Sequence, residues 1–176
     1  MPNWCNNSVQ ISGPRDKIQA LWLAAQKPED QGGGLLQAMH PMPEFKTESD
    51  DVMPNWWNWR VSNWGTKWEI TTEGLEYKED GDTATITGWF DSAWAPPVNA
   101  FAVYCDEQDD IQARLSYHEP GLCFVGVWTS EHGDDYHEYS GCDSDTVRDV
   151  IGAELDDEWN ISEEMAQYEA EEDSEE

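Results

Sequence analysis

Basic residues are scarce in this sequence of 176 residues: nine Lys and Arg stand against 38 Asp and Glu, for a formal net charge of -29. A field of that sign repels polyanions, so we expect neither direct binding of nucleic acid nor binding to an anionic membrane surface. A basic protein is the favoured partner. The sequence also has no apolar run near the ~20 residues that span a bilayer, so we expect no membrane-spanning segment.

Closely spaced cysteines are also missing. The four cysteines form no C-x-x-C pair, which argues against a zinc ribbon or a thioredoxin-type redox site. The first residues lack the basic and apolar regions of a signal peptide, so we expect a reducing, cytoplasmic environment with free thiols. Cys123 lies in an apolar strand pattern and Cys105 on the apolar stripe of a helix, so neither has the surroundings of a reactive thiolate.

Known catalytic motifs are absent from the sequence. It contains no phosphate-binding loop, G-x-S-x-G or H-E-x-x-H, and we therefore predict a protein that is not an enzyme and needs no cofactor. His132 and His137 lie among Asp134, Asp135 and Glu138, which are metal-ligating residue types. Their spacing matches no metal motif, so a polar hairpin tip is the preferred interpretation and we predict no metal site.

Tryptophan, by contrast, is abundant, and five of the eleven lie between Trp56 and Trp68. Trp57, Trp59 and Val61 alternate as on a half-buried strand, and residues 68–72 are expected to continue as strand. This segment has two interpretations. It is either a Trp-rich core hairpin or a recognition pocket with indole walls and polar groups at its floor.

The remaining patterns predict an α+β domain. Alternating apolar residues predict strands at 8–12, 83–90, 111–115 and 122–128, and apolar stripes predict helices at 14–26 and 98–105. This order fits a ferredoxin-like antiparallel sheet with two helices on one face. We expect the domain at residues 1–130, with a surface insertion at 27–54 that holds a short helical turn near Leu35, and an acidic hairpin and helical extension at 131–176.

Negative charge is concentrated in that extension. Residues 130–176 contain 19 acidic side chains and one base, Arg148, so they carry 1 − 19 = −18 of the formal charge. Val147, Ile151, Leu155 and Trp159 recur every four residues and predict an amphipathic helix at 144–158, followed by a second helical pattern after Asn160. The acids expected on the exposed faces of these helices are Asp149, Glu154, Asp156, Asp157, Glu158, Glu163 and Glu164.

Three stretches carry a resemblance to a known family. Residues 1–7 (MPNWCNN), 63–69 (NWGTKWE) and 90–97 (FDSAWAPP) closely resemble the signatures of the Api92-like, or YubB-like, ferredoxin-fold family of bacteriophages and plasmids. Glu69 and Ser92 replace the family's usual Asp and Thr and keep the chemistry. The resemblance covers about residues 1–130 and implies a ferredoxin-like domain from a mobile element in a bacterial cell. The acidic end is not attributed to the family.

Two functions are consistent with these features. The first is an acidic DNA mimic that inhibits a host nucleic-acid-binding protein of a defence or repair system, through the seven acids named above. The alternative is a protein that binds or sequesters a small, nucleotide-like ligand at the signature region. The residues expected to line that ligand site are Asn3, Trp4, Asn7, Asn63, Trp64, Thr66, Lys67 and Trp94.

Overall fold

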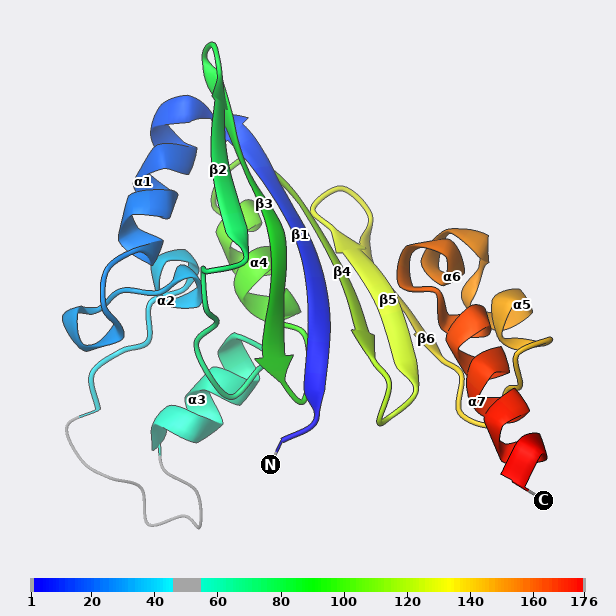
Figure 1. The fold of residues 1–176 in the computed structure, drawn as a ribbon. Coiled ribbons are helices and arrows are strands. Elements are labelled where there is room, and N and C mark those ends of the chain that lie inside the picture. The colour runs from blue at the N-terminus through cyan, green and yellow to red at the C-terminus, as the bar shows by residue number, and fades with distance from the viewer. Residues whose placement is uncertain (1, 46–54, 176) are drawn as a thin grey trace.

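A six-stranded sheet organises the protein (Figure 1). The structure, a computed structural model, describes residues 2–45 and 55–175. The strand order is β2-β3-β1-β4-β5-β6, and each neighbouring pair is antiparallel. The strands are β1 (Trp4–Pro14), β2 (Leu75–Asp80), β3 (Thr83–Ala93), β4 (Gln112–Glu119), β5 (Phe124–Thr129) and β6 (Gly133–Glu138).

Helices lie between β1 and β2, between β3 and β4, and after β6. The helices are α1 (Arg15–Ala25), the 3-10 turn η1 (Glu29–Gln31), α2 (Leu35–Met39), α3 (Asn55–Asn63), α4 (Val98–Asp106), α5 (Val147–Ile151), α6 (Ala153–Trp159) and α7 (Ile161–Glu175). Strands β1 to β4 with α1 and α4 have the ferredoxin-like order and the spatial arrangement β2-β3-β1-β4. The predicted α+β class is therefore confirmed, and β5 and β6 extend the sheet.

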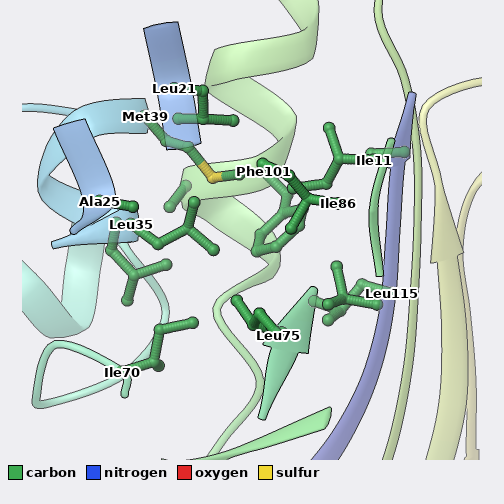
Figure 2. Close-up of a cluster of buried hydrophobic side chains, with 14 of the residues drawn as sticks. Ile11, Leu21, Ala25, Leu35, Met39, Ile70, Leu75, Ile86, Phe101 and Leu115 are labelled. Atoms are coloured by element: carbon green, nitrogen blue, oxygen red, sulfur yellow. The ribbon is translucent and has the colours of Figure 1, made fainter. Parts of the chain in front are cut away.

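The main core lies between the sheet and helices α1, α2 and α4 (Figure 2). Val9 and Ile11 of β1 are buried there, whereas their neighbours Ser8 and Gln10 point to the other face because side chains alternate along a strand. Phe101 of α4 is completely buried and packs edge-on against Trp128. Burying each such side chain contributes roughly 1.5–3 kcal/mol.

A second core joins the C-terminal helices to the opposite face of β5. Val125 of β5 packs there with residues from α5, α6 and α7, namely Val147, Ile151, Leu155 and Ile161. Val125 and Val127 alternate with Trp128, which belongs to the main core, so the two cores lie on opposite sides of the sheet. Figure 1 shows α5, α6 and α7 beyond β5 and β6, away from α1 and α2.

The Trp-rich segment is a helix, and the predicted strand at 57–61 is wrong. In α3 every side chain is at least partly exposed, and Trp59 packs edge-on against Trp64 and stacks on His40. Residues three and four apart are neighbours on a helix surface, so in α3 the alternation of Trp57, Trp59 and Val61 does not place them on one face as it would on a strand. The strand expected at 68–72 is also wrong, because β2 begins only at Leu75.

The segment expected as a surface insertion contributes to the core. Leu35, Leu36 and Met39 of the short helix α2 are buried, and α2 packs against α1 and α4. The helical turn predicted near Leu35 is confirmed, but its surface position is wrong for these three residues. Of the expected insertion at 27–54, residues 46–54 lie outside the described residues. Among the helices that the structure describes, none is long and apolar enough to cross a membrane.

Candidate functional site

The three signature segments, residues 1–7, 63–69 and 90–97, meet where β1 begins and β3 ends, around the buried amide side chain of Asn7. Asn7 is 1% exposed, and its Nδ2 donates hydrogen bonds to the carbonyls of Cys5 and Phe90 and to Ser92 Oγ, at 2.8, 3.2 and 2.9 Å. The Ser92 hydroxyl donates in turn to the carbonyl of Ala95 at 2.8 Å. This chain of bonds fixes the turn after β3, while the buried Asn7 Oδ1 has no hydrogen-bond partner among the described residues.

Thr66 and Gly65 brace the same turn from the other side. The buried Thr66 hydroxyl donates to the carbonyl of Ala93 at 2.9 Å. Gly65 has φ +93, and a Cβ there would lie 2.8 Å from the carbonyl oxygen of Pro96. A side chain at position 65 would therefore be both strained and obstructed.

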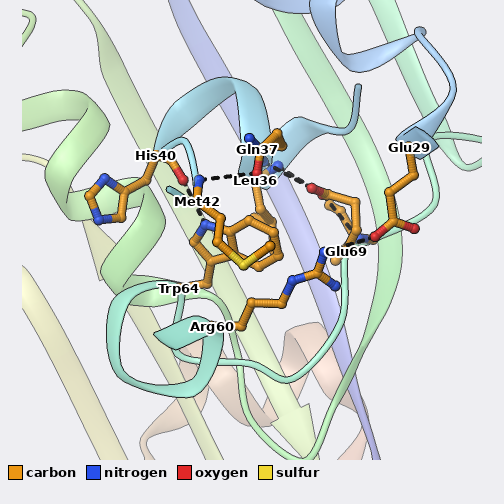
Figure 3. A network of polar contacts seen from close by, with 9 residues as sticks. Glu29, Leu36, Gln37, His40, Met42, Arg60, Trp64 and Glu69 are labelled. Carbon is orange, nitrogen blue, oxygen red and sulfur yellow. Dashed lines mark hydrogen bonds and ion pairs between the residues drawn. The ribbon is translucent and has the colours of Figure 1, made fainter. Parts of the chain in front are cut away.

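Trp64 is a core residue rather than a pocket wall. It is fully buried, and its Nε1 donates to the carbonyl of His40 at 2.8 Å (Figure 3). The guanidinium of Arg60 lies 4.6 Å from the centre of its ring. Beside it, the carboxylate of Glu69 accepts hydrogen bonds from the backbone amides of Leu36 and Gln37 at 2.8 and 2.9 Å.

Glu69 therefore stabilises the beginning of α2. Burial raises the pKa of this carboxyl above its usual value, although the amides of Leu36, Gln37 and Ile70 and the charge of Arg60 oppose the shift. Through these bonds Glu69 ties α2 to the chain after α3. The hydrogen bonds of Trp64 and Glu69 therefore stabilise the fold of this part of the signature.

Part of the signature region remains at the surface. Trp4 and Trp94 are each 46% exposed, and Trp4 lies 5.9 Å from Trp68 between ring centres. Lys67 Nζ lies 4.6 Å from the centre of the Trp68 ring, a cation–π contact. We call Trp4, Lys67, Trp68 and Trp94 the aromatic platform.

Trp94 adopts an unusual backbone conformation. Its φ of +72 lies in the left-handed region, which bulky residues rarely enter. Its backbone amide donates to the carbonyl of Asn3 at 2.9 Å, so the bonds around the turn hold it in place. Such strain costs of order 1–3 kcal/mol and persists only where the surrounding structure imposes it.

The structure divides the eight predicted ligand residues. Asn7, Trp64 and Thr66 are buried and satisfy structural contacts. Asn63 donates from Nδ2 to the carbonyl of Trp59 within α3, and Asn3 contributes its backbone carbonyl. Trp4, Lys67 and Trp94 are left on the aromatic platform.

The acidic helix expected at 144–158 is broken at Gly152. This glycine has φ +85 and separates α5 from α6, so the single predicted helix is wrong. The break allows Ile151 and Leu155 to enter the second core from two differently directed helices. Asn160, also in the left-handed region with φ +54, ends α6 before α7.

Asp156 is buried, although the sequence predicted it on an exposed face. It is 2% exposed and accepts hydrogen bonds from the Ser162 amide at 2.8 Å, the Ser162 hydroxyl at 2.7 Å and Arg148 Nη1 at 2.7 Å. Burial opposes its ionisation, but the bonds from Ser162 and Arg148 hold the pKa of Asp156 below its usual value. This carboxylate connects α5, α6 and α7.

Two more of the predicted acids have internal partners. Asp157 pairs with Arg148 at 2.7 Å, and Glu158 forms a two-pronged ion pair with Arg114 of β4, with contacts of 3.0 and 2.6 Å. The predicted acids that remain exposed, and whose side chains form no hydrogen bond or ion pair within the described chain, are Asp149, Glu154, Glu163 and Glu164. We call these four the acidic helix surface.

The histidines behave differently from one another. Among the described residues no group of three or more His, Cys, Asp or Glu side chains could hold a metal ion. His137 lies 3.1 Å from Asp135 on β6, and His132 lies 3.7 Å from Glu131 at the hairpin tip. His118, which the sequence analysis did not single out, is 6% exposed with Nε2 2.7 Å from the Tyr139 hydroxyl, and burial lowers its pKa to about 4.

Burial raises the pKa of two of the thiols, Cys5 and Cys105, which is the opposite of what a reactive thiolate needs. Burial raises the pKa of Cys5 well above its usual range. Burial, with a smaller contribution from Asp106, raises the pKa of Cys105 to about 11. All four cysteines are free.

Comparisons with known proteins indicate a ferredoxin-like family. A family model described as "Ferredoxin-like domain in Api92-like protein" matches residues 64–175. The crystal structure of protein api92 from Yersinia pseudotuberculosis is similar, with 12% sequence identity and a TM-score of 0.47, over 81% of this chain and 99% of that chain. No curated protein matches the chain. The family match includes α5, α6 and α7, so the likeness expected to end near residue 130 continues through the acidic helices.

Proposed function

This chain belongs to the family of the ferredoxin-like domain in Api92-like protein, and from that premise we propose that it is a non-enzymatic accessory protein of a bacteriophage or plasmid. It acts in the cytoplasm of the bacterial host as an acidic mimic of DNA, and it occupies the nucleic-acid-binding surface of a basic defence or repair protein. One observation carries the proposal. The acidic helix surface remains exposed, while Arg148, the one base among residues 130–176, is bound to Asp156 and Asp157.

The mimicry depends on charges at fixed positions. The four acids come from three helices, Asp149 from α5, Glu154 from α6, and Glu163 and Glu164 from α7, so the packing of these helices sets the spacing of the charges. The second core and Asp156 hold α5, α6 and α7 against the sheet, so these charges are not those of a free tail. A basic groove built for a polyanion is attracted to such a surface by its long-range field, and the attraction weakens with salt.

A displacement assay tests the proposal. Purified restriction endonucleases, CRISPR nucleases and DNA repair enzymes are loaded with a fluorescent duplex, and the full chain is added. We expect displacement from at least one of them at about 0.05 M salt and a strong loss of it at about 0.3 M. If the chain displaces DNA from none of these proteins, the proposal is contradicted.

A matched pair of variants tests the location of the surface. The first replaces Asp149, Glu154, Glu163 and Glu164 by Asn or Gln. The second removes four exposed acids from distant parts of the chain, Asp30, Glu73, Asp80 and Asp82, in the same way. Both have a formal charge of −29 + 4 = −25. We expect the first to weaken displacement at least about tenfold, at roughly 0.5 kcal/mol per charge, and the second to change it little. Equal losses mean that net charge alone, without a localised surface, is responsible.

The aromatic platform supports a second candidate function, the binding of a small nucleotide-like ligand. The observation that favours it is the left-handed backbone of Trp94, because strain held by a network of bonds is concentrated at functional sites. Exposed indole rings stack on bases, and Lys67 offers a positive charge to a phosphate.

Isothermal titration calorimetry with AMP and with ATP tests this second candidate. We expect Trp4→Ala and Lys67→Ala each to weaken binding, because the first removes a stacking ring and the second removes the positive charge, and neither side chain belongs to the core. Tyr168→Ala, which removes a 69% exposed aromatic side chain from α7, is the control. If neither nucleotide binds at about 1 mM, or if the control loses as much affinity as the two variants, the platform is not a nucleotide site.

A further inference from the structure

The face of the sheet opposite the main core is only partly covered. The covering contact comes from α6, whose Trp159 packs edge-on against Trp89 of β3 at 5.5 Å between ring centres. Trp159 Nε1 also donates to Ser116 Oγ of β4 at 2.9 Å. Trp89 keeps 54% of its surface exposed, and beyond it the strands β1, β3 and β4 present their side chains to solvent.

Two hollows lie end to end on this uncovered face. The first has a volume of about 420 Å³, and the second, of about 230 Å³, shares Gln10 and Arg114 with it. We call the two together the sheet trough. From Ser8 to Ser12 the trough follows β1 for about 13 Å, at about 3.3 Å per residue. The side chains that face it are Ser8, Gln10, Ser12, Glu76, Thr87, Trp89, Gln112, Arg114 and Thr129.

Two of the three charged side chains that line the trough are paired within the protein. Arg114 is paired with Glu158 at 2.6 Å, and Glu76 is paired with Lys78 at 3.2 Å. Glu131 lies at the far end of the second hollow, outside the row of uncharged side chains. On a protein with a formal charge of -29, a floor made mostly of hydroxyl and amide groups is the exception. The trough therefore suits neither a polyanion, which the overall field repels, nor a polycation, which needs a row of unpaired carboxylates rather than the single Glu131 at one end.

The polar groups in the trough are available for a ligand. Within the part of the chain that the structure describes, the side chains of Ser8, Gln10 and Thr87 form no hydrogen bonds with protein. They are adjacent across the strands, because Ser8 is opposite Trp89 and Gln10 is opposite Thr87. An exposed indole next to three free hydroxyl and amide groups matches a ring that is apolar on its face and carries hydroxyls on its edge.

From this geometry we infer that the sheet trough binds a neutral oligosaccharide. The CH face of one sugar ring packs on Trp89, and its hydroxyls exchange hydrogen bonds with Ser8, Gln10 and Thr87. The length of the trough accommodates about three sugar rings along β1. Since the ligand is uncharged, the overall negative field does not oppose it. This site is separate from the acidic helix surface and does not depend on the proposed mimicry.

The test is a titration of the isotope-labelled full chain with three neutral oligosaccharides, maltotetraose, cellotetraose and chitotetraose, followed by NMR. We expect at least one of them to bind at up to about 10 mM and to shift resonances of β1, β3 and β4. Because no charge is involved, the affinity should be unchanged when salt is raised from about 0.05 to about 0.5 M. If none binds, or if the shifted resonances lie elsewhere, the inference is overturned.

Three variants identify the contact. Trp89→Ala should weaken binding at least about tenfold, and Thr87→Val at least about threefold. Thr87→Val keeps the size of the side chain, so it tests the hydroxyl even if loss of Trp89 disturbs the contact with Trp159. Tyr168→Ala removes an exposed aromatic side chain far from the trough and should leave binding unchanged. Unaltered affinity in Thr87→Val and Trp89→Ala, or binding of tetralysine at these same residues in place of sugar, refutes the assignment.

Discussion

Asp156 and Asp157 allow a sharp test of what holds the acidic helices in place. Both carboxylates accept from the same atom, Arg148 Nη1, and both distances are 2.7 Å. Their surroundings differ, because the side chain of Asp156 is 2% exposed and that of Asp157 is 67% exposed. Asp156 also accepts two hydrogen bonds from Ser162. Burial, rather than geometry, therefore distinguishes the two ion pairs.

The expected losses of stability follow from this difference. Asp156→Asn places an amide among three donors and leaves the charge of Arg148 with only its exposed partner, so we expect the free energy of unfolding to fall by about 3 kcal/mol. Asp157→Asn removes an exposed pair that is screened by water, and its cost should be below about 1 kcal/mol. Each variant removes one negative charge, so the difference cannot come from net charge.

Urea denaturation at neutral pH, followed by circular dichroism, measures both variants, and hydrogen exchange of α5, α6 and α7 locates the effect. The pKa of Asp156 is lowered in the folded chain, so its contribution is present above the carboxyl's usual value and is lost as the pH falls through the folded value. The gap between the parent chain and Asp156→Asn should therefore shrink below about pH 4. If the two variants lose equal stability, the reasoning is wrong.

Further predictions concern other parts of the fold. At Trp94, where φ is +72, Trp94→Gly should be more stable than Trp94→Ala by about 1 kcal/mol in the same urea assay, the reverse of the order at ordinary positions. Equal stability of the two would show that the turn relaxes. His118 has a pKa of about 4 in the fold, so between about pH 6.5 and that value only the unfolded chain takes up the proton. As the pH is lowered over this range, the free energy of unfolding should fall by up to about 1.4 kcal/mol per pH unit. His118→Gln should remove that part of the slope. An identical pH profile for the variant contradicts this assignment. Gly126→Ala should destabilise the sheet by at least about 1 kcal/mol, measured by thermal denaturation, because a Cβ would lie 2.4 Å from the Tyr117 hydroxyl and 2.6 Å from the Asp135 carbonyl oxygen.

Local patterns were sufficient where one face of an element is buried along its whole length. Val9 and Ile11 identified β1, and the apolar stripe of residues 98–105 identified α4, which ends at Asp106. The helical turn at Leu35 was also visible, but its burial was not, because that depends on α1 and α4 packing around it. In α3 the local signal was misleading, since Trp is enriched in strands, whereas here Trp59 packs on His40 and Trp64 in a helix.

The candidate sites divide along the same line. Composition alone placed the negative charge in the last quarter of the chain. The alternation of residues along the predicted strands indicated that Ser8, Gln10 and Thr87 point away from the apolar face. Neither signal could show that Trp159 from α6 would pack beside this row, 43 residues after its hydrogen-bond partner Ser116. The sheet trough was missed because its walls come from separate elements.

By itself, the sequence determined the charge, the α+β order of elements and the positions of most strands, because each follows from composition or from a short repeat. Only the tertiary structure decided which polar residues are available. Asn7, Thr66 and Asp156 are as polar in the sequence as Gln10, Thr87 and Asp149, yet the first three are buried and spend their hydrogen bonds on the fold. The difference is burial, which depends on neighbours brought from distant parts of the chain, and burying a polar group costs free energy unless hydrogen bonds within the fold compensate for the lost water.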